Sequence, residues 1–176
     1  MISPGGAICV GVSGGKDSVA LATALHRLYS YHEIPYTVRA LTLDPCFGGI
    51  ETDYSELSGF FSAHGIPYTI VRTDIGPMVF DVRKEQNPCA LCAKMRRGTL
   101  HKRAKALGCN KVATGHHLDD AIETFFMNLF GEERLACFSP ATWLSPSHVT
   151  LIRPLLLSTD AAVARPAFCL PVQQSR

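Results

Sequence analysis

The sequence has no long apolar run, no export signal and little net charge. No apolar stretch reaches the roughly 18 residues that a membrane-spanning helix needs, so we expect no membrane segment. Residues 1–6 lack the basic start and apolar stretch of a signal peptide, and we therefore expect a soluble, cytoplasmic protein. Hydrophobic residues make up 47% and charged residues 18% of the 176 residues, which fits one globular domain and excludes a disordered chain.

The cysteines do not suggest a disulfide framework, because their number, seven, is odd and no export signal precedes them. Any cysteine that matters is better explained by thiol chemistry or metal binding. Cys9 and Cys109 lie at predicted strand ends and are expected to be packed core thiols.

The net charge is only +2, but its sign is unevenly spread. Residues 83–105 hold eight Lys or Arg residues and one acid, Glu85, in a chain that is otherwise acidic. A basic segment of this kind favours a polyanionic partner, although a solvated helix face explains it as well.

Alternating strand and helix patterns predict the fold. A continuous apolar run at 7–12 is typical of a strand buried on both faces, and residues 19–29 have helical apolar spacing. The other predicted elements are strands at 36–43, 67–71, 111–114 and 149–152, helices at 52–63, 91–107 and 120–130, and an irregular connection at 73–90. Asp120 is expected to cap the last helix, with Glu123 completing a capping box. The order predicts an α/β fold with a parallel, doubly wound sheet and helices on both faces; Trp143 and the Phe residues are expected in its core.

The loop after the first strand carries the strongest chemical signal. Its glycines allow backbone N–H groups to approach an anion, and the following helix adds the positive end of its dipole. A lysine and two serine hydroxyls complete a group suited to pyrophosphate. The residues are Ser13, Gly14, Gly15, Lys16, Asp17 and Ser18. An ordinary capped turn is the alternative, but the whole hexapeptide at this position favours phosphate binding.

This hexapeptide resembles the PP-loop signature of the N-type ATP pyrophosphatases, which have an adenine nucleotide alpha hydrolase-like fold. Three further blocks, at 88–98, 113–124 and 152–155, resemble the tRNA 2-thiocytidine biosynthesis (TtcA-like) branch of that superfamily. The blocks occur in the family's order. They indicate a PP-loop ATP-binding domain over residues 1–157 and a shortened C-terminal tail over 158–176.

Cys89 and Cys92 form a C-x-x-C pair at the start of the basic helix. Nearby cations and a helix N-terminus favour thiolates, so the pair suits an iron–sulfur cluster, with zinc, a redox pair or inert thiols as alternatives. Cys169 is the best third ligand, because it is the tail's only cysteine. The resemblance implies a [4Fe-4S] cluster held by these three residues.

The remaining candidates follow predicted strands or the cysteine pair. Asp119 and Asp120 are placed to hold Mg²⁺ against ATP phosphates or to assist transfer, and helix capping is the alternative. The resemblance places Gly115 and His116 beside the nucleotide, Leu43 beside the adenine and Asp44 at the reaction centre; read alone, Asp44 is as well explained as a turn residue. Arg96, with its neighbour Arg97, is expected to neutralise a phosphate, or else to be surface charge.

The resemblance implies ATP-dependent 2-thiolation of a tRNA cytidine. The base oxygen is adenylated, pyrophosphate leaves into the loop at 13–18, and sulfur then replaces AMP. The expected partners are tRNA and a cysteine desulfurase or other sulfur donor, with a second copy of the chain, as a homodimer, a further candidate. The alternatives are a lysidine synthetase-like adenylating enzyme and a shortened relative that binds ATP or metal without catalysis.

Overall fold

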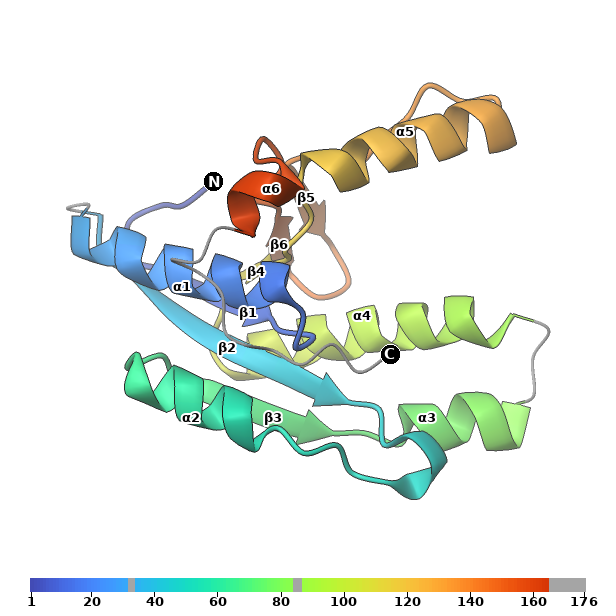
Figure 1. Ribbon diagram of the computed structural model, residues 1–176, viewed down its shortest axis with the longest axis horizontal. Coiled ribbons are helices and arrows are strands. Elements are labelled where there is room, and N and C mark those ends of the chain that lie inside the picture. The colour runs from blue at the N-terminus through green and yellow to red at the C-terminus, as the bar shows by residue number, and fades with distance from the viewer. Residues whose placement is uncertain (32–33, 84–86, 165–176) are drawn as a thin grey trace.

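The computed structural model describes residues 1–31, 34–83 and 87–164, which form a six-stranded sheet flanked by helices (Figure 1). The strand order is β3-β2-β1-β4-β6-β5. The strands are β1 (Gly6–Gly11), β2 (Tyr36–Asp44), β3 (Tyr68–Arg72), β4 (Lys111–Ala113), β5 (Ala141–Leu144) and β6 (Val149–Ile152). All neighbouring strands pair in parallel except β5, which is antiparallel to β6. The predicted doubly wound α/β class is confirmed, and β5 is a strand that the sequence reading missed.

The central strand β1 contributes to both faces of the sheet, as its unbroken apolar run predicts. Ile8 and Val10 are fully buried among residues of α1 (Lys16–Tyr31) and α2 (Ser55–Ala63). Cys9 points to the other face, where it packs with Ala104 of α4 (Pro88–Ala106) and with Cys109. The predicted core positions of Cys9 and Cys109 are confirmed, since both are buried.

Residues 75–83 and 88–90 are helical, so the prediction of an irregular connection over 73–90 is wrong for these described parts. It contains α3 (Ile75–Pro77), the π-helical turn η2 (Met78–Arg83) and the first turn of α4. Ile75 and Val79 are buried against Cys92 of α4. A local sequence pattern does not reveal this contact. Pro88 opens α4, and the Asn87 side chain accepts a hydrogen bond from the backbone N–H of Ala90 at 3.1 Å.

Helix α5 (Leu118–Gly131) begins earlier than predicted and is capped differently. His117 is its N-cap, and Asp120 is the third helical residue, whose carboxylate accepts a hydrogen bond from the His117 backbone N–H at 2.8 Å. The predicted capping box of Asp120 with Glu123 is therefore wrong. The capping box of α5 is formed by His117 and Asp120 instead, three residues nearer the N-terminus.

The prediction that Trp143 and the Phe residues belong to the core holds only in part. Phe61 is fully buried, but Trp143 is 58% exposed, Phe126 47% exposed and Phe130 78% exposed. Helix α5 extends beyond the sheet in Figure 1, and none of its residues is buried. Two further short elements are η1 (Phe47–Gly49) and α6 (Asp160–Val163). Among the described residues no helix is long and apolar enough to cross a membrane.

Candidate functional site

The candidate site lies where the strand order reverses direction. From β1 the chain continues to β2 on one side, whereas β4, the other neighbour of β1, leads on to the β6 side. In open α/β sheets such a switch point leaves a crevice outside the carboxyl ends of the two strands. A cavity of about 300 Å³ opens there. Its lining residues are Gly11, Ser13, Gly15, Asp17, Ser18, Thr114, Gly115, His116 and Asp120. Loops about 100 residues apart in the sequence thus form one cavity.

The loop at 13–18 is held by its own hydrogen bonds. The Ser18 hydroxyl donates to the Gly15 carbonyl at 2.8 Å and accepts from the Ser13 backbone N–H at 3.3 Å. Gly14 has φ +91°, a backbone conformation that residues with a side chain rarely adopt, and this explains glycine at that position. The loop therefore keeps its shape as it leads from β1 into α1. Ser13, Gly15, Asp17 and Ser18 line the cavity, whereas Gly14 and Lys16 are not among its described lining residues.

Lys16 is paired with two carboxylates. Its Nζ contacts Asp17 Oδ1 at 2.8 Å and also contacts Asp160 Oδ1, from the start of α6. Burial lowers the Lys16 pKa, but the hydrogen bonds with Asp160 and Asp17 outweigh it, so the pKa is raised above its usual value. Asp160 shows the matching effect, since its hydrogen bond with Lys16 lowers its pKa. Lys16 is consequently charged at neutral pH.

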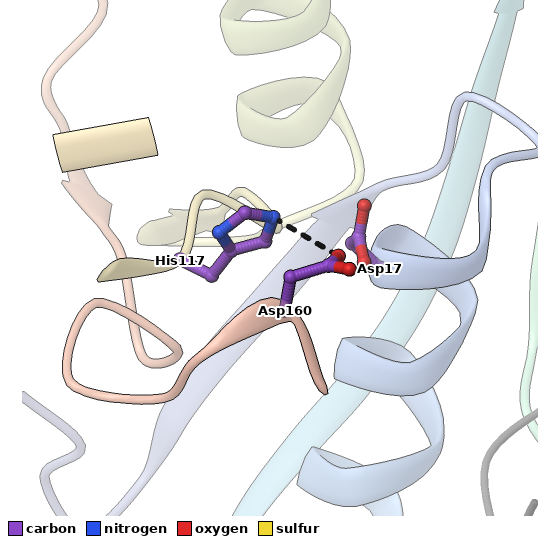
Figure 2. Close-up of side chains that lie close together, drawn as sticks. All are labelled: Asp17, His117 and Asp160. Atoms are coloured by element: carbon purple, nitrogen blue, oxygen red, sulfur yellow. Dashed lines mark ion pairs between the residues drawn. The ribbon is translucent and has the colours of Figure 1, made fainter. Parts of the chain in front are cut away.

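Asp17, His117 and Asp160 form a cluster that the sequence reading did not identify (Figure 2). One ligand atom from each residue lies within 4.8 Å of those of the others, and His117 Nε2 is 3.5 Å from Asp160 Oδ1. The Asp119 carboxylate accepts the backbone N–H of Asp160 at 2.7 Å and so fixes α6 beside the cluster. Thr159 caps α6 by accepting the Ala162 N–H at 3.3 Å, and a capping threonine indicates a helix start in the sequence but not a site residue.

His116 lines the cavity within a small group of side chains. Its Nδ1 lies 2.9 Å from Thr114 Oγ1, and its ring lies 5.2 Å from that of Phe138. The Arg153 guanidinium stands over the same Phe138 ring, 4.8 Å from its centre. Burial first, and then the nearby Arg153, lower the His116 pKa, so the imidazole is neutral at neutral pH. Arg153 belongs to the block at 152–155, to which sequence reasoning assigned no role.

Other predicted site residues lie away from the described cavity lining. Asp44 is fully buried, and its carboxylate accepts hydrogen bonds from the N–H of Cys46 at 3.1 Å and the N–H of Thr52 at 2.9 Å. These contacts give Asp44 a structural task in the loop after β2. Leu43 is a buried core residue. Neither residue is among those that line the cavity.

The cysteine pair and the arginines lie on α4. Cys89 is exposed and Cys92 is 7% exposed, packed beside Ile75 and Val79. Arg96 is half-buried and Arg97 exposed. No residue of α4 is among the described residues that line the cavity. Cys169, the predicted third ligand, lies outside the described residues.

The chain is similar in sequence to known proteins. A family model described as a PP-loop domain matches residues 3–166. A tRNA-cytidine(32) 2-sulfurtransferase of Syntrophotalea carbinolica is 39% identical over 165 residues, which are 93% of this chain and 63% of that protein. The namesake from Neisseria meningitidis is 39% identical over 88% of this chain and 48% of its own length.

A solved structure is similar as well. It is the U34-tRNA thiolase NcsA from Methanococcus maripaludis with its [4Fe-4S] cluster, which matches with a TM-score of 0.73 and 27% identity. The match covers 92% of this chain and 55% of that one. This chain therefore spans roughly half to two thirds of the length of the proteins that it resembles.

Proposed function

The chain belongs to the PP-loop domain family, and from this membership we propose that it is the ATP-binding part of a tRNA thiolase that modifies cytidine. The observation that carries the proposal is the cavity at the switch point, because it joins the loop at 13–18 to the block at 114–120. The similarity to tRNA-cytidine(32) 2-sulfurtransferases supports the choice of substrate.

ATP would place its phosphates against the loop at 13–18. The backbone N–H groups of Gly14 and Gly15 and the N-terminus of α1 suit an anion, and Lys16 supplies a full positive charge beside them. Ser13, Asp17 and Ser18 complete the loop, and the adenine would lie toward the β2 edge near Leu43. Pyrophosphate would leave into this loop because the same donors stabilise its growing charge.

A divalent cation fits the cluster of Asp17, His117 and Asp160. Two carboxylates and one imidazole, with ligand atoms within 4.8 Å of one another, are a donor set for Mg²⁺ or Mn²⁺. We propose that these residues hold the Mg²⁺ that accompanies ATP. Asp119 and Asp120, the residues first predicted for this task, would support it by fixing α6 and the His117 backbone.

The thiol pair fits two of the ligands of a [4Fe-4S] cluster. Cys89 and Cys92 are three residues apart on one helix, so their side chains lie on the same side of α4. Cys169 stays the proposed third ligand, and a zinc ion is the alternative occupant. Such a cluster, when bound, would supply an iron atom able to carry sulfur. The NcsA structure, which contains its [4Fe-4S] cluster, supports the iron–sulfur choice.

The proposed reaction has two displacements. First the cytidine O2 attacks the α-phosphorus of ATP, and the bond from that phosphorus to the pyrophosphate oxygen breaks. Then a sulfur nucleophile, supplied by a cysteine desulfurase or another donor, attacks C2 and AMP leaves with the former base oxygen. In this scheme Lys16 and Arg96 stabilise the transferring phosphoryl group, neutral His116 borders it, and Asp44 holds the loop beside it.

The test separates ATP use from cluster assembly. Wild-type chain, purified without oxygen, is expected to contain iron and sulfide and to transfer sulfur to a tRNA transcript with ATP. Lys16→Ala should abolish sulfur transfer while keeping the iron, whereas Cys89→Ala should lose the iron while still binding ATP. Lys111→Ala is the matched control, because the Lys111 ammonium donates to the Ser3 hydroxyl at an exposed position and Lys111 is not among the described residues that line the cavity.

Three outcomes would contradict the proposal. Stoichiometric zinc without iron would rule out the cluster. Lysine incorporation instead of sulfur would indicate a lysidine synthetase-like enzyme. ATP binding without any tRNA modification would indicate a non-catalytic binding protein.

A further inference from the structure

One side of α4 carries an exposed row of cations. Lys94, Arg97 and Lys105 are all exposed, and we call them the α4 stripe. Lys94 and Lys105 are eleven residues apart, which is about three turns, and Arg97 lies less than one turn after Lys94, so the three share one side of the helix. None of them forms an ion pair with a described residue, whereas Arg72 and Arg134 elsewhere are paired with Glu51 and Glu132.

The space beside the stripe is open. Gly98 lies one turn after Lys94, and a Cβ placed on it would meet no atom within 4 Å. No exposed large apolar residue of the described chain belongs to α4. A helix that binds a membrane surface needs such residues opposite its cations, so α4 does not have the amphipathic pattern of a membrane-binding helix. Its features suit a hydrophilic polyanion that approaches closely.

The stripe is aligned with the proposed site. Leu100 packs against Gly11, the last residue of β1, so the preceding turns of α4 extend beyond the carboxyl edge of the sheet. The cavity opens at that edge, and Cys89 and Cys92 lie in the same turns. Lys105 lies toward the other end of the helix. The stripe therefore spans about 17 Å and runs toward the edge where the chemistry is proposed.

We propose that the α4 stripe binds the phosphate backbone of the substrate RNA and aligns one strand with the carboxyl edge of the sheet. This inference rests on the proposed function, since it takes the polyanion to be the tRNA. Each cation that replaces counterions on a phosphate contributes to affinity and makes that affinity depend on salt. The contribution is independent of base sequence, so the stripe positions the RNA and does not select the nucleoside.

The experiment measures binding of an unmodified tRNA transcript by fluorescence anisotropy between 50 and 200 mM KCl, without ATP. The triple variant Lys94→Gln, Arg97→Gln, Lys105→Gln should bind at least tenfold more weakly at low salt. The slope of log K against log salt should become shallower by about 2 to 3, since each lost contact removes roughly 0.7 to 0.9.

The chain offers a matched control two residues from Lys105. Arg103 is also exposed, but it lies nine residues after Lys94, two and a half turns, and so on the other side of α4. Arg103→Gln removes the same charge as Lys105→Gln, and only the latter should reduce the salt slope. Circular dichroism checks that α4 remains folded in each variant.

Four results distinguish the possibilities. Equal effects of Lys105→Gln and Arg103→Gln would overturn the inference, because net charge alone would then explain binding. Anionic vesicles that lose affinity in the triple variant while tRNA does not would overturn it in favour of a membrane. Absence of tRNA binding by the wild type would overturn both the inference and the proposed function. Binding through the stripe without any sulfur transfer would support the inference and overturn the function alone.

Discussion

Gly115 is the contact point between the two halves of the cavity, and its replacement by alanine should weaken nucleotide binding. A Cβ on Gly115 would lie 3.0 Å from the Asp17 carbonyl carbon and 3.1 Å from the Ser18 nitrogen. Both atoms are backbone atoms of the first turn of α1 and cannot rotate aside. The loop after β4 therefore has to move away from the loop at 13–18 and the start of α1.

The size of the effect follows from the overlap. Ordinary contact begins at 3.4 Å, so the two loops must separate by a few tenths of an ångström. Overpacking of this kind costs about 1–3 kcal/mol of folding free energy. The shift also displaces the N–H groups of the loop at 13–18. If about 1.4 kcal/mol of this free energy is lost from ATP binding, ATP affinity falls roughly tenfold.

Calorimetric titration with ATP, together with urea unfolding, measures both quantities. Gly59→Ala is the control, because Gly59 lies in α2 and a Cβ there would meet no atom within 4 Å. That variant should gain up to about 1 kcal/mol in stability, as helix interiors favour alanine, and keep its ATP affinity. Wild-type affinity and stability in Gly115→Ala would refute the close packing of the two loops as the basis of the site.

Two other predictions test packing and charge. Phe61→Ala should lower the free energy of unfolding by about 3–5 kcal/mol, because Phe61 is fully buried. Phe130 is 78% exposed, so Phe130→Ala should change the free energy of unfolding by less than about 0.5 kcal/mol. Equal losses of stability for the two variants in urea titrations would contradict this prediction. Arg153→Gln should raise the His116 pKa in an NMR titration, because it removes a cation that lowers it, and Arg153→Lys should keep it low. An unchanged His116 pKa in Arg153→Gln would show that Arg153 does not contribute to lowering it.

The central sheet could be predicted because its signal is local. The apolar run of β1 and the helical spacing of α1 both arise from residues adjacent in the chain, and both elements formed close to their predicted bounds. β5 lacks such a signal, since its four residues are alternately exposed and half-buried and depend on pairing with β6. Residues 75–83 are helical, and Ile75 and Val79 are buried there against Cys92 of α4, a contact that a local sequence pattern does not reveal.

Burial was less predictable than helix formation. The apolar spacing of α5 correctly predicts a helix, but spacing does not tell which surface covers it, and Phe126 and Phe130 remain largely exposed. The same limit applies to the site. Residues 13–18 and 115–120 are recognisable as motifs, whereas Asp160 becomes visible only when α6 is folded beside Lys16 and Asp119.

Asp160 leads to a prediction that joins ATP and metal binding. Lys16, the cation proposed for the phosphates, contacts Asp17 and Asp160, and the lowered pKa of Asp160 keeps its carboxylate ionised at neutral pH. Phosphates that approach Lys16 therefore meet a carboxylate already in place. A cation held by Asp17, His117 and Asp160 would neutralise that carboxylate and release Lys16, so the two ligands should favour each other.

Titration of ATP with Mg²⁺ and with EDTA measures this coupling, which we expect to be about tenfold, within the usual range for linked sites. Asp160→Asn should bind metal-free ATP more tightly than the wild type, because the competing charge is gone, and should gain much less from Mg²⁺. Glu132→Gln removes a charge from an exposed ion pair with Arg134 and should keep the wild-type gain. The same gain in all three proteins would mean that Asp160 neither competes with the phosphates nor holds the cation, and Lys16 would then reach the phosphates without leaving its present partners.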